Sequence, residues 1–211
     1  MHDHPALQRQ LEAGIAALRL ALPADANARL LDYLELLQRW NQTYNLTAVR
    51  DSGEMVTRHL LDSLAVLPFV AGDTLADLGS GAGLPGIPLA IAAPDLQVTL
   101  VDGNGKKARF LREAARALPL RNLRVDQVRV EKLQGAFDCI TARAFASLAK
   151  MLAWGGHALA DGGVWLALKG RIDEAELIDV PAPFRVAAVH ALDVPGLDAQ
   201  RHVIVIRRAA D

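Results

Sequence analysis

Three glycines at every second position, directly after a short apolar segment, constrain this chain more than any other feature. The segment TLADLGSGAGLPGIP at 74–88 predicts a strand that ends in an acid, then a turn with Gly79, Gly81 and Gly83, then a helix with two prolines in its first turn. Glycines at this spacing permit positive φ and let a flat or charged ligand approach the backbone. A dinucleotide-binding fold has G-x-G-x-x-G, whereas the third glycine here comes one residue early. The spacing is typical of S-adenosylmethionine sites, with a purely steric turn as the alternative.

From residue 74 the chain alternates between predicted strands and predicted helices. Strands separated by helices imply right-handed crossovers and a mainly parallel sheet. Only DVPGLDAQ separates the last two strands, so these should pair as an antiparallel hairpin. We therefore expect an α/β, Rossmann-like class I S-adenosylmethionine-dependent methyltransferase fold, with a mostly parallel seven-stranded sheet closed by that hairpin. The expected strands are 74–78, 97–102, 123–130, 137–142, 164–168, 185–190 and 202–207, and the expected helices are 84–93, 105–118, 147–160 and 173–179.

The residues before the glycine turn predict a helical extension. Helices are expected at 6–22, 28–40 and 55–70, the second with apolar residues spaced by three and four along one stripe. A chain of 211 residues is long enough for one α/β domain with such an addition. We expect an N-terminal helical extension over 1–72 and a methyltransferase domain over 73–211.

Composition excludes several classes of protein. Hydrophobic residues make up 52% and charged residues 22% of the chain, the balance of a globular protein. The longest apolar runs, such as 87–93, are too short to cross a bilayer, and the first ten residues lack the pattern of a secretory signal. A single cysteine, Cys139, fits a reducing compartment and reads as a buried, inert thiol. The sequence thus predicts a cytoplasmic protein without a membrane anchor or a metal site, and a monomer by default.

Charge is unevenly distributed along the chain although the net charge is −1. Residues 106–132 hold nine basic side chains against three acids, and Arg201, Arg207 and Arg208 follow near the C-terminus. Segregation of this kind is the footprint of a polyanionic partner. A solvated helix face explains the basic spacing equally well, so both interpretations stay open.

Residues at three further predicted strand ends complete a candidate cofactor site. In an open α/β sheet, ligands bind beyond the carboxyl ends of the strands. Asp102 ends the second strand and can accept both ribose hydroxyls, Val130 and Glu131 follow the third and can meet an adenine edge, and Arg143 ends the fourth. A loop cap at Asp102 or a helix-start acid at Glu131 is the structural alternative for each alone.

The fourth strand also indicates which chemistry is absent. Enzymes that methylate an exocyclic amine usually carry Asn/Asp-Pro-Pro-aromatic there, whereas this chain has TARAFA at 141–146. Cytosine-C5 enzymes need a nucleophilic cysteine, and neither a metal cluster nor a Ser–His–Asp set is recognisable. A methyl acceptor that needs no base fits this pattern. Guanine N7 is such an acceptor, because its lone pair is free and carries no proton.

Six segments of the chain together resemble the RsmG (GidB) family of bacterial methyltransferases, which modify a guanine N7 in the 530 loop of 16S rRNA. The resemblance runs from about residue 27 to residue 207. Its motifs are WNQTYNLTAVRD at 40–51, RHLLDSL at 58–64, ADLGSGAGLPGIPLA at 76–90, ARAFA at 142–146, ALKG at 167–170 and RH at 201–202.

The resemblance implies S-adenosylmethionine as cofactor and 16S rRNA, or the 30S subunit, as partner. Expected cofactor contacts are Gly79, Gly81, Gly83, Leu84, Asp102, Val130, Glu131 and Arg143. No catalytic base is expected; Arg143 and Lys169 are candidates for positioning RNA or the cofactor carboxylate. The RNA-binding candidates are Arg58, His59, Lys106, Arg112, Arg116, Lys169 and Arg201.

Alternatives remain for several of these residues. Lys169 can be a solvated lysine at a strand end, and Arg58 and His59 can have a buried capping role. Asn41 and Asn45 are expected to fix their loop by side-chain to backbone hydrogen bonds.

Three other functions share parts of the pattern. The basic stretch disfavours a small-molecule methyltransferase, and the glycine spacing disfavours a nucleotide-dependent oxidoreductase. The intact glycines and acids disfavour a non-catalytic RNA-binding module.

Overall fold

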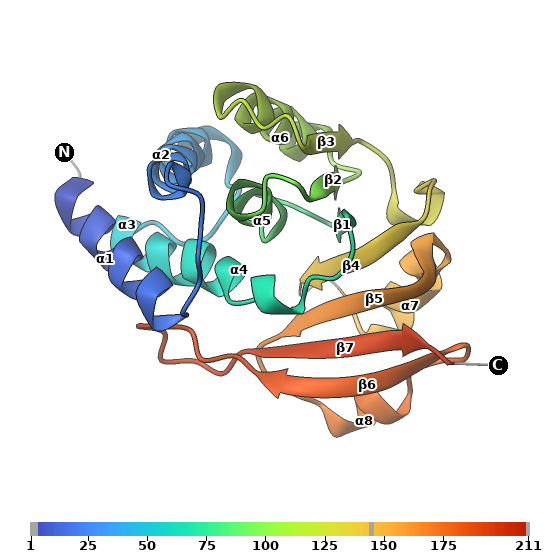
Figure 1. The fold of residues 1–211 in the computed structure, drawn as a ribbon. Coiled ribbons are helices and arrows are strands. Elements are labelled where there is room, and N and C mark those ends of the chain that lie inside the picture. Colours follow the sequence, from blue (N-terminus) through green and yellow to red (C-terminus); the bar gives the residue numbers. More distant parts are fainter. Residues whose placement is uncertain (1–3, 144–145, 210–211) are drawn as a thin grey trace.

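The computed structural model describes residues 4–143 and 146–209. A seven-stranded sheet in the order β3-β2-β1-β4-β5-β7-β6 runs through the molecule (Figure 1). Strands β1 to β5 pair in parallel, and β7 pairs antiparallel with both β5 and β6, so the predicted class I methyltransferase fold is confirmed. The strands are β1 Thr74–Leu78, β2 Gln97–Val101, β3 Leu123–Asp126, β4 Phe137–Arg143, β5 Leu159–Lys169, β6 Phe184–Ala191 and β7 His202–Arg208.

Helices cover the two faces of the sheet unequally. Alternate residues of each inner strand point to opposite faces, so Leu75 and Val98 belong to one apolar core and Ala76 and Val101 to the other. The larger core lies under α1 His4–Ala17, α2 Ala26–Tyr44, α3 Ser52–Met55, α4 Asp62–Leu64, α5 Gly86–Ala92 and α6 Gly105–Ala117. The smaller core lies under α7 Leu148–Gly155 and α8 Glu174–Ile178.

The N-terminal helices share the larger core with the sheet. Leu30 and Leu37 of α2 and Leu60 before α4 are fully buried in the same cluster as Leu100 of β2. The division of the chain at residue 72 stays a prediction, because apolar side chains from both sides of it form one continuous interior.

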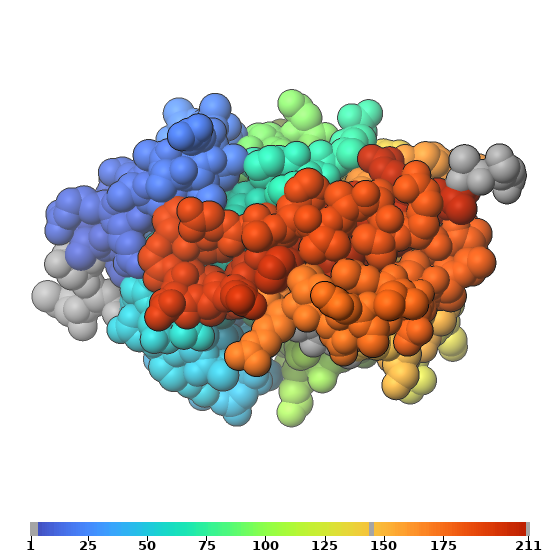
Figure 2. Space-filling view, turned by 90° about the horizontal axis from the view of Figure 1, so that it is seen from below, coloured from blue at the N-terminus to red at the C-terminus, as the bar shows by residue number. Residues whose placement is uncertain are grey.

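The C-terminal hairpin returns to the N-terminal helices. In the loop between β6 and β7, Val194 is buried in the larger core, and Gly196 lies beside Thr57. Figure 2 shows these segments, in red and orange, beside the blue and cyan N-terminal helices on one surface. Residues from the two ends of the chain are therefore available to one site.

Several predicted boundaries are wrong. The first helix ends at Ala17 instead of residue 22, and the third strand ends at Asp126 instead of residue 130, because the N–H of Val128 turns back to the carbonyl of Asp126. The helix expected over 147–160 ends at Gly155, and β5 begins at Leu159 instead of residue 164. Gly162, at a φ of 74°, lies where the register with β4 shifts. The pair Gly162-Gly163 has the composition of a turn but lies in a bulge within β5, so the strand begins before it.

The helix expected over 55–70 is divided into four pieces. It begins as α3, continues as a π-helix over Val56–Leu61, becomes α4, and ends in a 3₁₀ turn over Leu67–Phe69. A π-helix widens the turn, and such segments occur frequently at functional sites. It leaves Arg58 exposed while the next residue, His59, is buried.

Tyr33 links the N-terminal helices directly to the glycine turn. Its side chain is fully buried, and its hydroxyl donates a hydrogen bond of 2.7 Å to the carbonyl of Ala82. Burial raises the pKa of the phenol, so the hydroxyl stays protonated and can only act as this donor or as an acceptor.

We expect Tyr33→Phe to lower the free energy of unfolding by about 1–3 kcal/mol, because the buried Ala82 carbonyl loses its donor. Urea unfolding followed by circular dichroism measures the change. Tyr44→Phe is the matched control, since the Tyr44 hydroxyl has no hydrogen-bond partner among the residues that the structure describes. Equal stability of Tyr33→Phe and the wild type would contradict the role of this bond.

Candidate active site

The glycine turn has the backbone that its spacing predicts. Gly79, Gly81 and Gly83 have φ values of 69°, 59° and 87°. A Cβ on Gly83 would overlap the side chain of Ile87, so this glycine allows close packing of α5 on the turn. A Cβ on Gly81 would meet nothing nearer than 3.8 Å. The steric explanation therefore applies to Gly83, while Gly81 borders open space.

Asp102 holds the turn from the end of β2. Its Oδ2 accepts the N–H of Gly81 at 2.9 Å, and its Oδ1 accepts the N–H of Asn104 at 2.8 Å. A carboxylate offers about four acceptor positions, so each oxygen keeps one for a ligand hydroxyl. The side chain of Asn104 in turn caps α6 by accepting the N–H of Lys106 at 2.9 Å.

Asp77 lies inside β1 and not at its end, because the strand continues to Leu78. Its Oδ1 accepts the Thr141 hydroxyl at 2.9 Å, and its Oδ2 accepts the Gly86 N–H at 3.2 Å. Burial is the main cause that raises the pKa of this carboxyl from 3.8 to about 6, against these hydrogen bonds, which lower it. Asp77 thus joins β1, β4 and the start of α5 beneath the turn.

The residues expected near an adenine lie after the third strand, and not in it. Val130 and Glu131 belong to a 3₁₀ turn over Val130–Lys132. Val130 packs against the smaller core, and Glu131 is exposed. Leu84, the other expected contact, is buried beside the glycine turn. The Leu84 N–H donates to the Ser80 carbonyl at 3.1 Å, and the Val130 carbonyl accepts the Leu133 N–H at 3.1 Å, so of the two residues only Val130 is partly exposed.

A cavity of about 420 Å³ lies between the π-helix and the carboxyl ends of β4 and β5. It brings together both expected positioning residues and four of the expected RNA-binding residues, with Lys169 in both sets, although they are far apart in the sequence. These are Arg58, His59, Arg143, Lys169 and Arg201. Ala144 and Phe145, in the middle of the ARAFA motif, lie outside the described residues.

A buried acid that the sequence analysis missed organises this cavity. Asp62 Oδ1 lies 3.0 Å from Arg201 Nε, and Asp62 Oδ2 lies 3.5 Å from Arg143 Nη1. Burial raises the pKa of Asp62, while Arg201 and then Arg143 lower it. The signal for this residue was a lone acid in the apolar motif RHLLDSL, four residues after Arg58.

His59 contributes a neutral ring to the same cavity. Burial is the main cause that lowers its pKa to about 4, and the charges of Arg143 and Arg58 add to the effect. Its Nε2 lies 2.9 Å from the Thr47 hydroxyl, and its buried Nδ1 has no partner in the described part of the chain. At neutral pH the ring can therefore accept or donate a hydrogen bond without adding charge.

Asn41 holds the loop that carries Thr47. It donates to the Thr47 carbonyl at 3.0 Å and accepts the Thr47 N–H at 2.9 Å, which confirms the expected side-chain to backbone bonds. Asn45 differs, because its side chain accepts from Arg50 at 2.9 Å while its own backbone, at a φ of 49°, ends α2.

The remaining basic candidates fall into three groups. Lys169 is not a solvated lysine, since its Nζ lies 2.8 Å from Glu176 and 3.2 Å from the Ala146 carbonyl. Arg207 and Arg208 bind backbone carbonyls, so this part of the C-terminal charge is structural. Lys106, Arg112 and Arg116 line a separate groove between α2 and α6.

Cys139 is buried in the sheet, and burial raises the pKa of its thiol to about 12, which confirms the expected inert role. Within residues 4–143 and 146–209, no three His, Cys, Asp or Glu side chains are grouped to hold a metal ion. None of the helices in these residues combines the length and apolar character needed to cross a membrane.

Comparison with known proteins decides the family. A family model described as rRNA small subunit methyltransferase G (GidB) matches residues 26–204. A Ribosomal RNA small subunit methyltransferase G from Xanthomonas campestris pv. campestris (strain 8004) is 58% identical over 190 residues, covering 89% of this chain and 90% of the relative. The chain belongs to this methyltransferase family. A relative of the same name from Stenotrophomonas maltophilia (strain K279a) is 54% identical over 211 residues, covering 98% of this chain and 99% of its own. The resemblance found from the motifs is confirmed, and the chain is a methyltransferase.

Solved structures support the fold of this methyltransferase. A ribosomal protein L11 methylase from Lactobacillus delbrueckii subsp. bulgaricus aligns with a TM-score of 0.54 at 19% identity, covering 71% of this chain and 77% of that one. A coclaurine N-methyltransferase aligns with a TM-score of 0.57 at 13% identity, covering 91% and 69%. At these identities the likeness concerns the class I methyltransferase fold alone.

Asp77 should make stability depend on pH. Between pH 4 and 6 the folded chain keeps a proton on Asp77 that the unfolded chain has lost. The free energy of unfolding should therefore fall as pH rises through this window, by about 3 kcal/mol from this group. Asp77→Asn should remove that fall, as measured by urea unfolding at several pH values. The difference from the wild type isolates Asp77 from His59, whose lowered pKa acts in the opposite direction.

Asp138→Asn is the control. Hydrogen bonds from Thr74 and Asp73 lower the pKa of Asp138, so its contribution rises with pH. The difference curves of the two variants should have opposite signs, and curves of the same sign would contradict the assignment of the Asp77 pKa.

Proposed function

We propose that this methyltransferase uses S-adenosylmethionine to methylate guanine N7 in the 530 loop of 16S rRNA. The observation that carries the proposal is the arrangement at one edge of the sheet. The open glycine turn and the Asp102 carboxylate lie at the ends of β1 and β2, and a basic cavity of about 420 Å³ lies at the ends of β4 and β5. A cofactor on the turn would thus present its reactive end toward the cavity.

The chain's residues fit S-adenosylmethionine at the turn. Gly79 is exposed and Gly81 is partly exposed, and the space beside Gly81 is open. Both oxygens of Asp102 retain acceptor capacity for ribose hydroxyls. The contacts of Val130 and Leu84 with the cofactor are proposed from the resemblance of the motifs. Arg143, which lines the cavity at the end of β4, would meet the cofactor carboxylate.

The cavity suits a nucleotide of an RNA substrate. Four cations, Arg58, Arg143, Lys169 and Arg201, line the cavity. The acids that pair with them are Glu54, Asp62 and Glu176, so a small excess of positive charge remains toward a phosphate-rich ligand. The ion pairs of Asp62 fix the guanidinium groups of Arg143 and Arg201 before a ligand arrives. The cavity is also partly enclosed by the neutral ring of His59.

S-adenosylmethionine, when bound, supplies an electrophilic methyl group. Guanine N7 carries no proton, so no side chain has to remove one. The residues of the cavity then need only hold the base in line and exclude water. This requirement agrees with a site whose described lining includes partly exposed cations and a buried, neutral histidine.

The relatives' name supports the small-subunit rRNA as substrate, and the site of modification within it rests on the resemblance of the motifs. We further propose a cytoplasmic monomer that meets its rRNA there, either naked or within the 30S subunit. A small-molecule methyltransferase is the second candidate, because the cavity alone would accept a single nucleotide.

We expect 16S rRNA from a strain that lacks this protein to have lost one 7-methylguanosine. Borohydride reduction and aniline cleavage, followed by primer extension, detect the position. Wild-type protein with S-adenosylmethionine should restore the cleavage on naked 16S rRNA or on 30S particles. An unchanged pattern in the deletion strain would refute the substrate.

Gly81→Ala should weaken S-adenosylmethionine binding by at least about tenfold, because a Cβ there fills the surface on which the ligand lies. Titration calorimetry measures the affinity. Gly162→Ala is the matched control, since Gly162 also has a positive φ, 74°, and nothing within 4 Å, but lies in the bulge of β5. Equal affinities of the two variants would show that the turn is only structural. Tighter binding of NAD than of S-adenosylmethionine by the wild type would favour an oxidoreductase.

A further inference from the structure

A second basic site lies outside the cavity, in the groove between α2 and α6. This α2–α6 groove has a volume of about 1180 Å³ and shares no lining residue with the cavity. Trp40 and Tyr44 come from the last turns of α2. The other lining residues are Asn104, Gly105, Lys106, Arg109, Arg112, Glu113, Arg116 and Gln127.

Three aromatic rings lie in a row from the core into this groove, with Trp40 stacked on Tyr44 but tilted by 58° against Phe110. Phe110 is fully buried, and its ring centroid lies 5.7 Å from that of Trp40. Trp40 is stacked on Tyr44, with centroids 5.1 Å apart and an interplanar angle of 25°. Trp40 and Tyr44 are partly exposed, so the stack ends at the solvent with Tyr44. Its hydroxyl has no partner among the described residues.

Positive charge faces the end of the stack. Four basic side chains of α6 line the groove against one acid, Glu113, which pairs with Arg116 at 2.9 Å. Lys106 and Arg109 are exposed and have no acidic partner in the part of the chain that the structure describes. Among the described residues, the side chain of Arg112 donates a hydrogen bond only to the uncharged Gln127, at 3.2 Å. The groove thus retains a positive charge that its own acid does not neutralise.

We propose that the α2–α6 groove binds a single-stranded segment of the RNA substrate, with one base continuing the ring stack on Tyr44 and the neighbouring phosphates lying along α6. Aromatic platforms beside a basic groove are the means by which proteins hold single strands. The inference rests on the proposed rRNA substrate. It adds a second RNA site, whose lining residue Asn104 lies two positions after the cofactor-binding candidate Asp102.

An acidic protein segment is the other polyanion that such charge attracts. It would use Lys106 and Arg109 but would gain little from a flat ring stack, because carboxylates do not stack. Dependence on the Tyr44 ring therefore distinguishes RNA from an acidic peptide.

The first test uses the full chain and a fluorescent single-stranded RNA of about 12 nucleotides. Tyr44→Leu keeps an apolar side chain but removes the ring, and we expect it to weaken RNA binding at least about fivefold in fluorescence anisotropy. Tyr44→Phe keeps the ring and should bind within about twofold of the wild type. S-adenosylmethionine affinity, measured by calorimetry, should stay unchanged in Tyr44→Leu, which excludes a general loss of structure.

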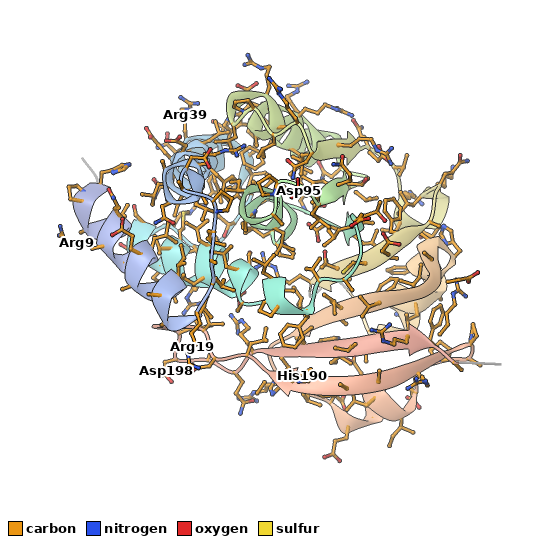
Figure 3. The ribbon with its side chains drawn as sticks, in the orientation of Figure 1. Arg9, Arg19, Arg39, Asp95, His190 and Asp198 are labelled. Carbon is orange, nitrogen blue, oxygen red and sulfur yellow. The ribbon has the colours of Figure 1, made fainter. Side chains whose placement is uncertain are left out.

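The second test concerns charge. The double variant Arg109→Gln/Arg112→Gln should lower the log–log slope of affinity against salt by about 0.7 for each phosphate that the variant no longer binds. Arg9→Gln/Arg185→Gln removes the same charge from exposed positions on α1 and β6, and it should leave the slope unchanged; Arg9 lies on α1 (Figure 3). An equal change of slope in both double variants would show that RNA responds to net charge alone, and it would overturn the proposal that the groove binds RNA.

Unaltered RNA binding by Tyr44→Leu would also overturn the proposal, as would equal dependence on Tyr44 for a polyglutamate probe. These results are independent of the rRNA methylation assay. If the wild type binds RNA through Tyr44 but leaves 16S rRNA unmodified, the groove stands and the proposed function fails. If 16S rRNA is modified but Tyr44→Leu binds RNA normally, the proposed function stands and the groove proposal fails.

Discussion

Two carboxylates hold the glycine turn between the first two strands of the sheet, and the rest of the site depends on this attachment. Asp102 binds the turn from the side through the Gly81 N–H, and Asp77 lies beneath it between Thr141 and Gly86. Backbone at positive φ is held only where its polar groups are paired, so these bonds keep the open face of the turn in place. Burial of the Asp77 carboxyl costs free energy. Its hydrogen bonds with Thr141 and Gly86, which join β1 to β4 and α5, offset part of this cost.

The N-terminal helices are part of this arrangement and not an appendage. Tyr33 reaches the turn from α2, and the π-helix supplies Arg58, His59 and then Asp62 to the cavity. Asp62 connects residues that lie far apart in the sequence, Arg143 at the end of β4 and Arg201 just before β7. A buried charge of this kind is stable only with its partners, so the cavity and the packing of the helices on the sheet support each other.

Much of the fold followed from the sequence, because three of its signals are local: the strand periodicity, the glycine turn and the absence of a helix pattern between the last two predicted strands. The mostly parallel seven-stranded sheet and its antiparallel hairpin were predicted, whereas the order of the strands and the grouping of Arg58, His59, Arg143, Lys169 and Arg201 in one cavity came from the structure. Asp62 and Tyr33 were missed because their roles depend on partners more than 45 positions away in the chain. The bulge at Gly162 was missed because strand pairing outweighed a local turn signal.

A cell holds free guanine nucleotides in great excess over any one position in its rRNA. A mononucleotide is small enough to enter the cavity, whereas the α2–α6 groove is a separate site with no lining residue in common with it. A polymer that occupies both sites gains from the high effective concentration of its second segment, with no tighter contact at either site. Two sites of moderate affinity would then together bind an RNA chain more tightly than either binds a mononucleotide. Selectivity of this kind needs no base-specific contact beyond the one that receives the methyl group.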